Sequence, residues 1–327
     1  MYFKYSTSYF SLAYFFFNFT MFVHPLVDGP AIFRIGFVTF PFYGAMYLLA
    51  FFIFQVLGEY RLKKTQHFTT DEFDVFFYYS LISVIAGGCI GDILFYRLKD
   101  SLTLFFALPR YSPAMQNIWL SLAVWLLFYV LSKLTDTAPL PFGFLGIPLL
   151  LLMTGGAGMS FHGALIGTLG ATLLYSYKFN KNCLDLLDFA APLVPPGLGL
   201  GRLANFVNGE LWGRPTQMPW GVIFPQVDFE PRHPSQLYEC VLEGIILFMI
   251  LWHFSKSKRP RGAVFGLAIT LYALFRIFIE FFREPDQSIG FIAWGWLTMG
   301  QLLSFPMLLV GFYFLFNAYP IRYRSSS

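Results

Sequence analysis

The chain has 327 residues, of which 57% are hydrophobic and only 12% are charged, and its mean hydropathy is +0.59. A soluble domain cannot bury so much apolar surface, so this composition predicts a membrane protein. The formal net charge of +4 is too small to indicate a nucleic-acid partner. The three cysteines, Cys89, Cys183 and Cys240, are scattered, and their spacing indicates neither a disulfide framework nor a metal site.

The first twenty residues, MYFKYSTSYFSLAYFFFNFT, combine Lys4 with an apolar run, as a signal peptide would. Bulky aromatic residues fill this run, however, and no small-x-small cleavage site follows it. The sequence therefore favours an uncleaved interfacial segment over a signal peptide. We assign this segment to an N-terminal arm, residues 1–39, on the outer face of the membrane.

Apolar windows of about 20 residues, the length of a membrane-spanning helix, recur along the rest of the chain. They lie at about residues 40–57, 76–96, 159–177, 186–206, 236–254, 262–282 and 296–317. The sequence therefore predicts an all-α polytopic membrane protein with about seven transmembrane helices. We expect one integral-membrane domain over residues 1–327.

Lysine and arginine residues concentrate in alternate loops, as the positive-inside rule describes. If the N-terminus lies outside, the inside segments contain Arg61, Lys63, Lys64, Lys178, Lys181, Lys256, Lys258, Arg259, Arg261, Arg322 and Arg324. The outside segments are longer in total, yet contain fewer basic residues. We therefore predict an outside N-terminus, an inside C-terminus and a small outer head that includes the loop 208–235.

Residues 98–155 form an insert whose topology the sequence leaves open. Its two apolar stretches, 117–133 and 139–153, are short or broken by proline and glycine. A single crossing would reverse every later loop and place the basic loop 256–262 outside. The insert therefore either crosses the membrane twice, as a hydrophobic hairpin, or lies in the outer interface.

Ionisable side chains within apolar windows cost about 2.5–3.5 kcal/mol each on insertion scales, so they usually face a cavity or a partner. Arg202 lies in a window interrupted by prolines and glycines, which predicts a broken helix that lines a polar site. A snorkelling arginine near the surface is the alternative. Because guanidinium matches phosphate, and because Asn205 and Asn208 can share its helical face, the segment indicates an anion site.

A second intramembrane arginine lies on another expected helix, where Tyr272, Arg276 and Glu280 recur every four residues on one face. Taken alone, Arg276 and Glu280 could form a self-neutralising pair. Two cations in one bundle instead favour an anion between them. Glu239 and Glu243, also four residues apart, require either a proton or a facing arginine, and we expect their role to be structural.

Two histidines are candidates for a general base, because an unperturbed imidazole titrates close to neutral pH. His162 begins an expected helix, and its glycine neighbours would admit a lipid or a second chain. A satisfied interfacial histidine is the alternative reading of His162. His233, in the outer loop, competes for the role of base.

Five ordered segments resemble motifs of the prolipoprotein diacylglyceryl transferase family. They are HGALIG at 162–167, DFAAPLVPPGLGLGRLANFVNGELWGRPT at 188–216, PRHPSQLYE at 231–239, LYALFRIFIEFFREPD at 271–286 and MGQLLSFPM at 299–307. FYGAMY at 42–47 is similar to the first span of that family. The resemblance covers most of the chain from about residue 24, apart from the insert.

The resemblance implies a multi-pass enzyme of the bacterial inner membrane with its active site toward the periplasm. Such enzymes transfer the diacylglyceryl group of phosphatidylglycerol to the lipobox cysteine of a prolipoprotein, forming a thioether and releasing glycerol phosphate. It also implies that Arg202 and Arg276 bind the phosphate and that His162 is critical. By position, the resemblance adds Tyr43, Asn205, Glu210, Gly213 and Tyr272 to the site. We add Asn208 because it can share a helical face with Arg202.

The chain departs from the family pattern in three places. Cys89 and Asp92 stand in the second expected span where the family usually has GGRIGY, and Ala164 replaces a glycine two residues after His162. The family arginine is absent there, so one auxiliary contact to the head group is not expected. The region between Tyr96 and His162 is much longer than the family norm.

The implied reaction fits the chemistry of the candidate residues. A thiol with a pKa of about 8.5 must lose its proton before it attacks, and fixed cations stabilise the charge that the departing phosphate gains. We expect Arg202 and Arg276 to hold the phosphate, Asn205 to orient the head group, and His162, or alternatively His233, to accept the thiol proton. We expect no metal or organic cofactor, and a monomer.

Two other classes of function also need a cationic cavity in a membrane. A phospholipid transporter or scramblase is the first, but transporters often contain an internal repeat and this sequence contains none. A catalytically degenerate scaffold that binds lipid is the second, prompted by Cys89 and Asp92. Modification of a lipobox peptide would separate the enzyme from both.

Overall fold

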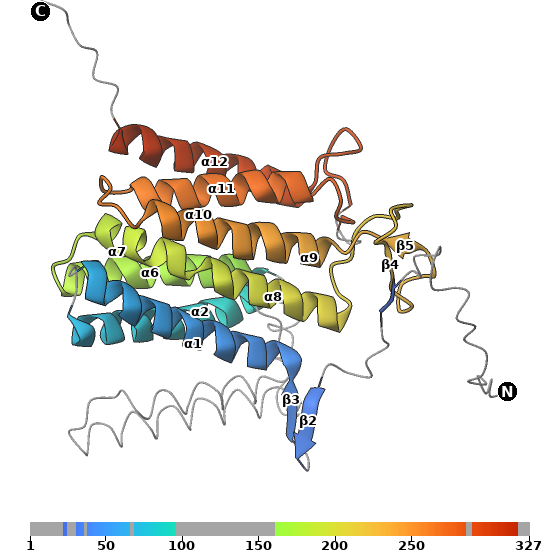
Figure 1. Cartoon of the computed structure of the whole chain (residues 1–327), viewed down its shortest axis with the longest axis horizontal. Coiled ribbons are helices and arrows are strands. Elements are labelled where there is room, and N and C mark those ends of the chain that lie inside the picture. The colour runs from blue at the N-terminus through green and yellow to red at the C-terminus, as the bar shows by residue number, and fades with distance from the viewer. Residues whose placement is uncertain are drawn as a thin grey trace, which may run out of the picture.

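The structure, a computed structural model, describes residues 22–24, 31–35, 38–65, 69–95, 161–285 and 290–319. Most of these residues are helical and form one bundle of helices that lie side by side (Figure 1). The helices are α1 (Phe42–Thr65), α2 (Thr70–Phe95), α6 (Phe161–Lys178), α7 (Cys183–Ala190), α8 (Pro195–Asn208), α9 (Ser235–Glu239), α10 (Leu247–Phe254), α11 (Ala263–Ile279) and α12 (Met299–Ala318). A helix, or a chain of linked helices, lies at each of the seven expected windows.

Three helices of the described part are long and apolar enough to cross a membrane: Phe42–Lys64, Ser235–Phe254 and Met299–Ala318. The bent pair Cys183–Leu193 and Pro195–Asn208, whose halves meet at 44°, is a fourth candidate. Its bend confirms the predicted broken helix, since prolines cannot continue the hydrogen-bond ladder and are tolerated only in the first turn of a new helix. The chain is therefore a helical membrane protein.

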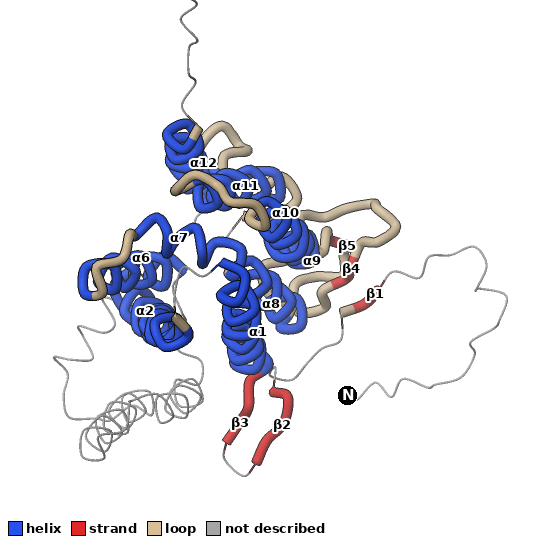
Figure 2. The backbone as a smooth tube through the Cα atoms, turned by 60° about the vertical axis from the view of Figure 1, so that its left-hand side comes forward, coloured by secondary structure: helices blue, strands red, loops and turns tan. Residues whose placement is uncertain are grey.

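Helix α8, which carries Arg202, lies between α1 and the α9–α10 segment (Figure 2). Gly199 of α8 faces Gly244 so closely that a side chain on either residue would meet the backbone of the other. Small residues commonly allow such close approach between membrane helices. The two glycines therefore bring Arg202 near Glu239 and Glu243, which precede Gly244 along the chain.

Short strands lie at one end of the bundle (Figure 1). Strand β1 (Phe22–Val23) pairs in parallel with β4 (Val222–Ile223), and β4 pairs antiparallel with β5 (Pro231–Arg232). A hairpin of β2 (Ala31–Ile35) and β3 (Val38–Pro41) precedes α1. The helical pattern did not predict these strands, which are too short to show a period. They join the N-terminal arm and the loop 208–235, which the sequence treats as separate outer elements.

Several predicted features lie outside the described residues. They include the first twenty residues and the whole insert 98–155, so the choice between a hairpin and an interfacial insert stays a prediction. Helix α2 contains Cys89 and Asp92, and helix α6 contains His162, but the side chains of these three residues are also outside the description.

Candidate active site

Arg202 of α8 and Arg276 of α11 meet at the carboxylate of Glu239, the last residue of α9. Nε of Arg202 lies 3.1 Å from Oε2 of Glu239, and Nη1 of Arg276 pairs with Oε1 of the same group. The Glu239 side chain is fully buried, whereas those of Arg202 and Arg276 are 18% and 12% exposed. A ligand would therefore reach the guanidinium groups before it reached the carboxylate.

Glu243 faces the same two arginines. It lies in the π-helical segment η3 (Cys240–Ile246), 3.4 Å from Nη2 of Arg202 and 3.9 Å from Nη1 of Arg276. Of the two alternatives that the sequence left open for Glu239 and Glu243, a proton or a facing arginine, the structure shows the arginine for both. A π-helical turn changes the side-chain phase within a helix, and such turns are frequent at functional sites.

Glu280 and Arg283 complete the group. Glu280 pairs with Nη2 of Arg276, four residues earlier, so the self-neutralising pair considered from the sequence does form. Nη1 of Arg283 lies 3.5 Å from Oε1 of Glu239 and 3.8 Å from Oε1 of Glu280. The pair is therefore part of a larger network, the arginine–glutamate cluster, whose members are Arg202, Arg276, Arg283, Glu239, Glu243 and Glu280.

Arg283 is not among the site residues predicted from the sequence. Arg283 follows Arg276 by seven residues and Glu280 by three, and this spacing continues one face of a helix. Helix α11 ends at Ile279, but the next turn keeps this direction because the N–H of Arg283 donates to the carbonyl of Ile279 at 3.1 Å. The spacing could therefore have identified it.

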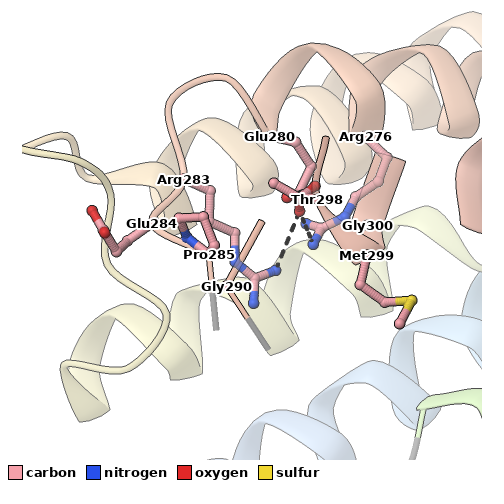
Figure 3. Close-up of a pocket in the computed structure, with 9 residues that line it drawn as sticks. All are labelled: Arg276, Glu280, Arg283, Glu284, Pro285, Gly290, Thr298, Met299 and Gly300. Atoms are coloured by element: carbon pink, nitrogen blue, oxygen red, sulfur yellow. Dashed lines mark hydrogen bonds and ion pairs between the residues drawn. The ribbon is translucent and has the colours of Figure 1, made fainter. Parts of the chain in front are cut away.

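A cavity of about 30 Å³ lies beside Arg276 and Arg283, close to Glu280 and the first turn of α12 (Figure 3). It is large enough to hold an ordered water molecule. Two guanidinium groups that border one small polar cavity are suited to an anionic oxygen.

The two predicted tyrosines lie near Arg202. Tyr43 is in the first turn of α1 and Tyr272 is on α11, one turn before Arg276, and both are close enough to interact with the charge of Arg202. Helices α1, α8 and α11 thus each contribute to the same site. The structure brings Tyr43 and Tyr272, which are 229 positions apart in the sequence, close to the same arginine.

Asn205 and Asn208 both turn their side-chain amides toward Glu210. Nδ2 of Asn208 donates to Oε1 of Glu210 at 2.8 Å, and Nδ2 of Asn205 lies 3.4 Å from Oε2. The carbonyl of Glu210 also accepts a hydrogen bond from the side chain of Gln236 at 2.5 Å. From the sequence we expected these amides to add neutral hydrogen-bond donors beside Arg202. In the structure they bind Glu210 and fix the turn that follows α8.

Gly213 lies where the loop 208–235 crosses the end of α11. Its N–H donates to the carbonyl of His233 at 2.9 Å, and it forms an antiparallel bridge with Arg283. A Cβ atom at this position would collide with the carbonyl oxygens of His233 and Phe282. Only glycine lets the loop approach Arg283 this closely, which explains its place among the predicted site residues.

His233 borders an apolar cavity of about 440 Å³, with Trp220, Tyr238 and Phe282 among its walls. The imidazole Nδ1 lies 3.1 Å from the hydroxyl of Tyr238, and the ring packs edge-on against Phe282 with centroids 5.2 Å apart. Burial lowers the pKa of His233, because desolvation disfavours the charged imidazolium. The imidazole is therefore neutral near pH 7 and can accept a proton.

Comparison with known proteins shows which family the chain resembles. Residues 30–317 match the family described as prolipoprotein diacylglyceryl transferase. A protein of Coxiella burnetii (strain RSA 331 / Henzerling II) named "Phosphatidylglycerol--prolipoprotein diacylglyceryl transferase" is 39% identical over 305 residues, which cover 93% of this chain and all of the relative. A protein of the same name from Legionella pneumophila (strain Paris) is 39% identical over 292 residues, 89% of this chain and 97% of the relative. The chain therefore belongs to the prolipoprotein diacylglyceryl transferase family.

Proposed function

We propose that this chain transfers the diacylglyceryl group of phosphatidylglycerol to the lipobox cysteine of prolipoproteins. The observation that carries this proposal is the meeting of Arg202 and Arg276 at one buried carboxylate inside an apolar bundle. Ionisable side chains inside a membrane are costly and, even where they pair with one another as here, they commonly mark a ligand site. A phospholipid supplies a suitable ligand, because its phosphate is anionic and its acyl chains stay in the surrounding lipid.

The arginines bind the phosphate diester and stabilise the charge that it gains on departure. Their planar forks match phosphate oxygens, and they act in a low-dielectric site where fixed charges have their largest effect. Asn205 orients the head group through the turn it shares with Glu210 and Asn208. Tyr43 and Tyr272 lie near Arg202, and Gly213 lets the loop approach Arg283.

The covalent step is a nucleophilic displacement at carbon. The cysteine thiol loses its proton to His162, with His233 as the alternative base, and the thiolate then attacks the glycerol carbon that bears the phosphate ester. The sulfur–carbon bond forms as the carbon–oxygen bond breaks, and glycerol phosphate leaves with the electron pair. Nothing is oxidised or reduced in this displacement, so the step needs no redox cofactor.

We place the enzyme in the bacterial inner membrane as a monomer with seven crossings, an outside N-terminus and an inside C-terminus. The C-terminal turns of α1 and α6 and the segments after α6 and α10 contain the described basic residues assigned to the inside, and they lie together at the end of the bundle opposite the strands (Figure 1). The strand-bearing end then faces the periplasm. Arg276 and Glu280, at the C-terminal end of α11, lie toward that side, where prolipoproteins expose their cysteine.

The test uses purified protein, phosphatidylglycerol vesicles and a lipobox peptide, with the peptide mass as the readout. We expect a mass gain of one diacylglyceryl unit, and no gain for a matched peptide with serine in place of the cysteine. Movement of lipid between leaflets without peptide modification would instead support the phospholipid transporter. Lipid binding without either activity would support the degenerate scaffold.

A further inference from the structure

The segment MGQLLSFPM at 299–307 is the one family-like motif to which the proposed reaction assigns no role, and it begins α12. Thr298 is the N-cap of this helix: its hydroxyl oxygen accepts from the N–H of Gln301 at 3.3 Å, and its own N–H donates to the Gln301 side chain at 3.1 Å. Thr298 and Gln301 are 2% and 1% exposed. The reciprocal bonds form a capping box, which fixes the start of the helix.

The same hydroxyl contacts the arginine–glutamate cluster. Oγ1 of Thr298 donates to Oε2 of Glu280 at 2.6 Å, a hydrogen bond in the range of charge-assisted pairs. Gly300 lies directly under this carboxylate, because a Cβ atom on Gly300 would overlap it. The carboxylate thus lies against the first turn of α12, where the helix dipole favours negative charge.

Each oxygen of Glu280 therefore has a separate partner. Oε2 accepts from Thr298, while Oε1 pairs with Nη2 of Arg276 and lies 3.8 Å from Nη1 of Arg283. With both oxygens occupied, the side chain of Glu280 cannot rotate without losing one contact. The carboxylates around Arg276 set the position of its guanidinium group. A rotation of the Glu280 side chain would therefore move that group.

We propose that Thr298 and Gly300 are positioning residues for the transfer reaction: the first turn of α12 fixes Glu280, and Glu280 in turn fixes Arg276. This inference rests on the proposed function. Neither residue needs to touch the phospholipid. A purely structural alternative is that Thr298 serves only as the N-cap of α12, with no effect on the reacting groups.

The first test compares Thr298→Val with Thr298→Ser in the peptide assay, with rates expressed per folded enzyme. Loss of a hydrogen bond to a charged group predicts about a 10- to 100-fold lower kcat for the valine variant, with KM for phosphatidylglycerol little changed. The serine variant keeps the hydroxyl and should recover most of the rate. The matched control is Thr270→Val, since Thr270 is also buried between α11 and α12 but donates only to the carbonyl of Gly266.

The second test separates the cap from the contact to Glu280. Gly300→Ala leaves both residues of the capping box in place and raises helix propensity, so a role in capping alone predicts unchanged or greater stability and an unchanged rate. Our inference predicts a lower kcat, because the added methyl group displaces Glu280. Gly170→Ala is the control, since a Cβ atom on Gly170 meets nothing within 4 Å.

Equal rates for Thr298→Val and the wild type would overturn the inference. So would equal losses in Thr298→Val and Thr270→Val, or a Thr298→Ser variant as slow as Thr298→Val. A wild-type enzyme that forms no diacylglyceryl peptide would reject the proposed function itself, whereas active wild type with unaffected variants rejects only the role of the α12 turn.

Discussion

Two of the described regions with arginine–carboxylate contacts, the loop 208–235 and the arginine–glutamate cluster, have different surroundings. In the loop 208–235, Arg232 pairs with Asp228 at 2.5 Å and lies 3.4 Å from Glu284, and those two carboxylate side chains are 34% and 38% exposed. In the arginine–glutamate cluster, the side chains of Glu239 and Glu243 are fully buried. Ion pairs of arginine with carboxylates therefore occur both near the solvent and inside the bundle.

The difference indicates what each region is for. The Asp228 side chain is 34% exposed, so solvent screens its pair with the largely buried Arg232 and the pair contributes about 0–1 kcal/mol, while the hydrogen bond from Arg232 lowers the pKa of Asp228. Buried ion pairs seldom stabilise a fold more than apolar packing would, yet breaking one leaves an uncompensated charge. Stability alone does not account for the buried cluster, which fits a ligand site.

The largest expected effect comes from removing the bridging carboxylate. Glu239→Ala leaves the guanidinium groups of Arg202 and Arg276 without their shared partner, and we expect a loss of about 3–5 kcal/mol in the free energy of unfolding. Asp228→Ala, its counterpart in the loop, should lose about 1 kcal/mol or less. Thermal unfolding in detergent micelles measures both variants. Equal losses of unfolding free energy in Glu239→Ala and Asp228→Ala would contradict the claim that the two regions differ.

The second effect concerns the general base. His162→Gln should lower the rate of transfer by about 10²–10⁴-fold, whereas His233→Gln should change it far less. Because burial lowers the pKa of His233, that imidazole stays neutral at pH values below its ordinary range near 6.5. If His233 were the base, the pH profile of kcat/KM would hold its plateau below that value and the His233→Gln variant would be the inactive one. Peptide modification measured across pH decides between them.

The smallest of these effects is expected where the two regions touch. Gly213→Ala inserts a methyl group between the loop backbone at His233 and the end of α11, and overpacking of this kind costs about 1–3 kcal/mol. The separation of the loop from Arg283 should also slow transfer. Gly170→Ala, which meets open space, should change neither unfolding nor rate. A stable and fully active Gly213→Ala variant would show that the loop need not lie so close.

Part of this architecture could be predicted from the sequence, because hydropathy and proline follow simple rules. The window 186–206 identified both a helix and its break, and the four-residue spacing of Arg276 and Glu280 offered their pairing as one of two alternatives. Pairing of β1 with β4 could not be predicted, since two-residue strands carry no period and their register is set by tertiary contacts.

The site shows the same limit. Sequence spacing placed Asn205 on the helical face of Arg202, but it could not show that Glu210, beyond the end of α8, would take up the amide. Nor could it show that Glu239 would bridge two arginines, because that depends on the packing of α8, α9 and α11. Contacts within one helix follow from periodicity, whereas contacts between helices require the fold.

The most direct test of the account is the rate of diacylglyceryl transfer to a lipobox peptide by Arg202→Ala, beside the wild type and Asp228→Ala. If the buried arginines hold the phosphate, Arg202→Ala should lose at least about 10²–10³-fold in kcat while remaining folded in the membrane, and Asp228→Ala should stay active. Full activity of a folded Arg202→Ala enzyme would contradict the claim that this guanidinium group stabilises the departing phosphate.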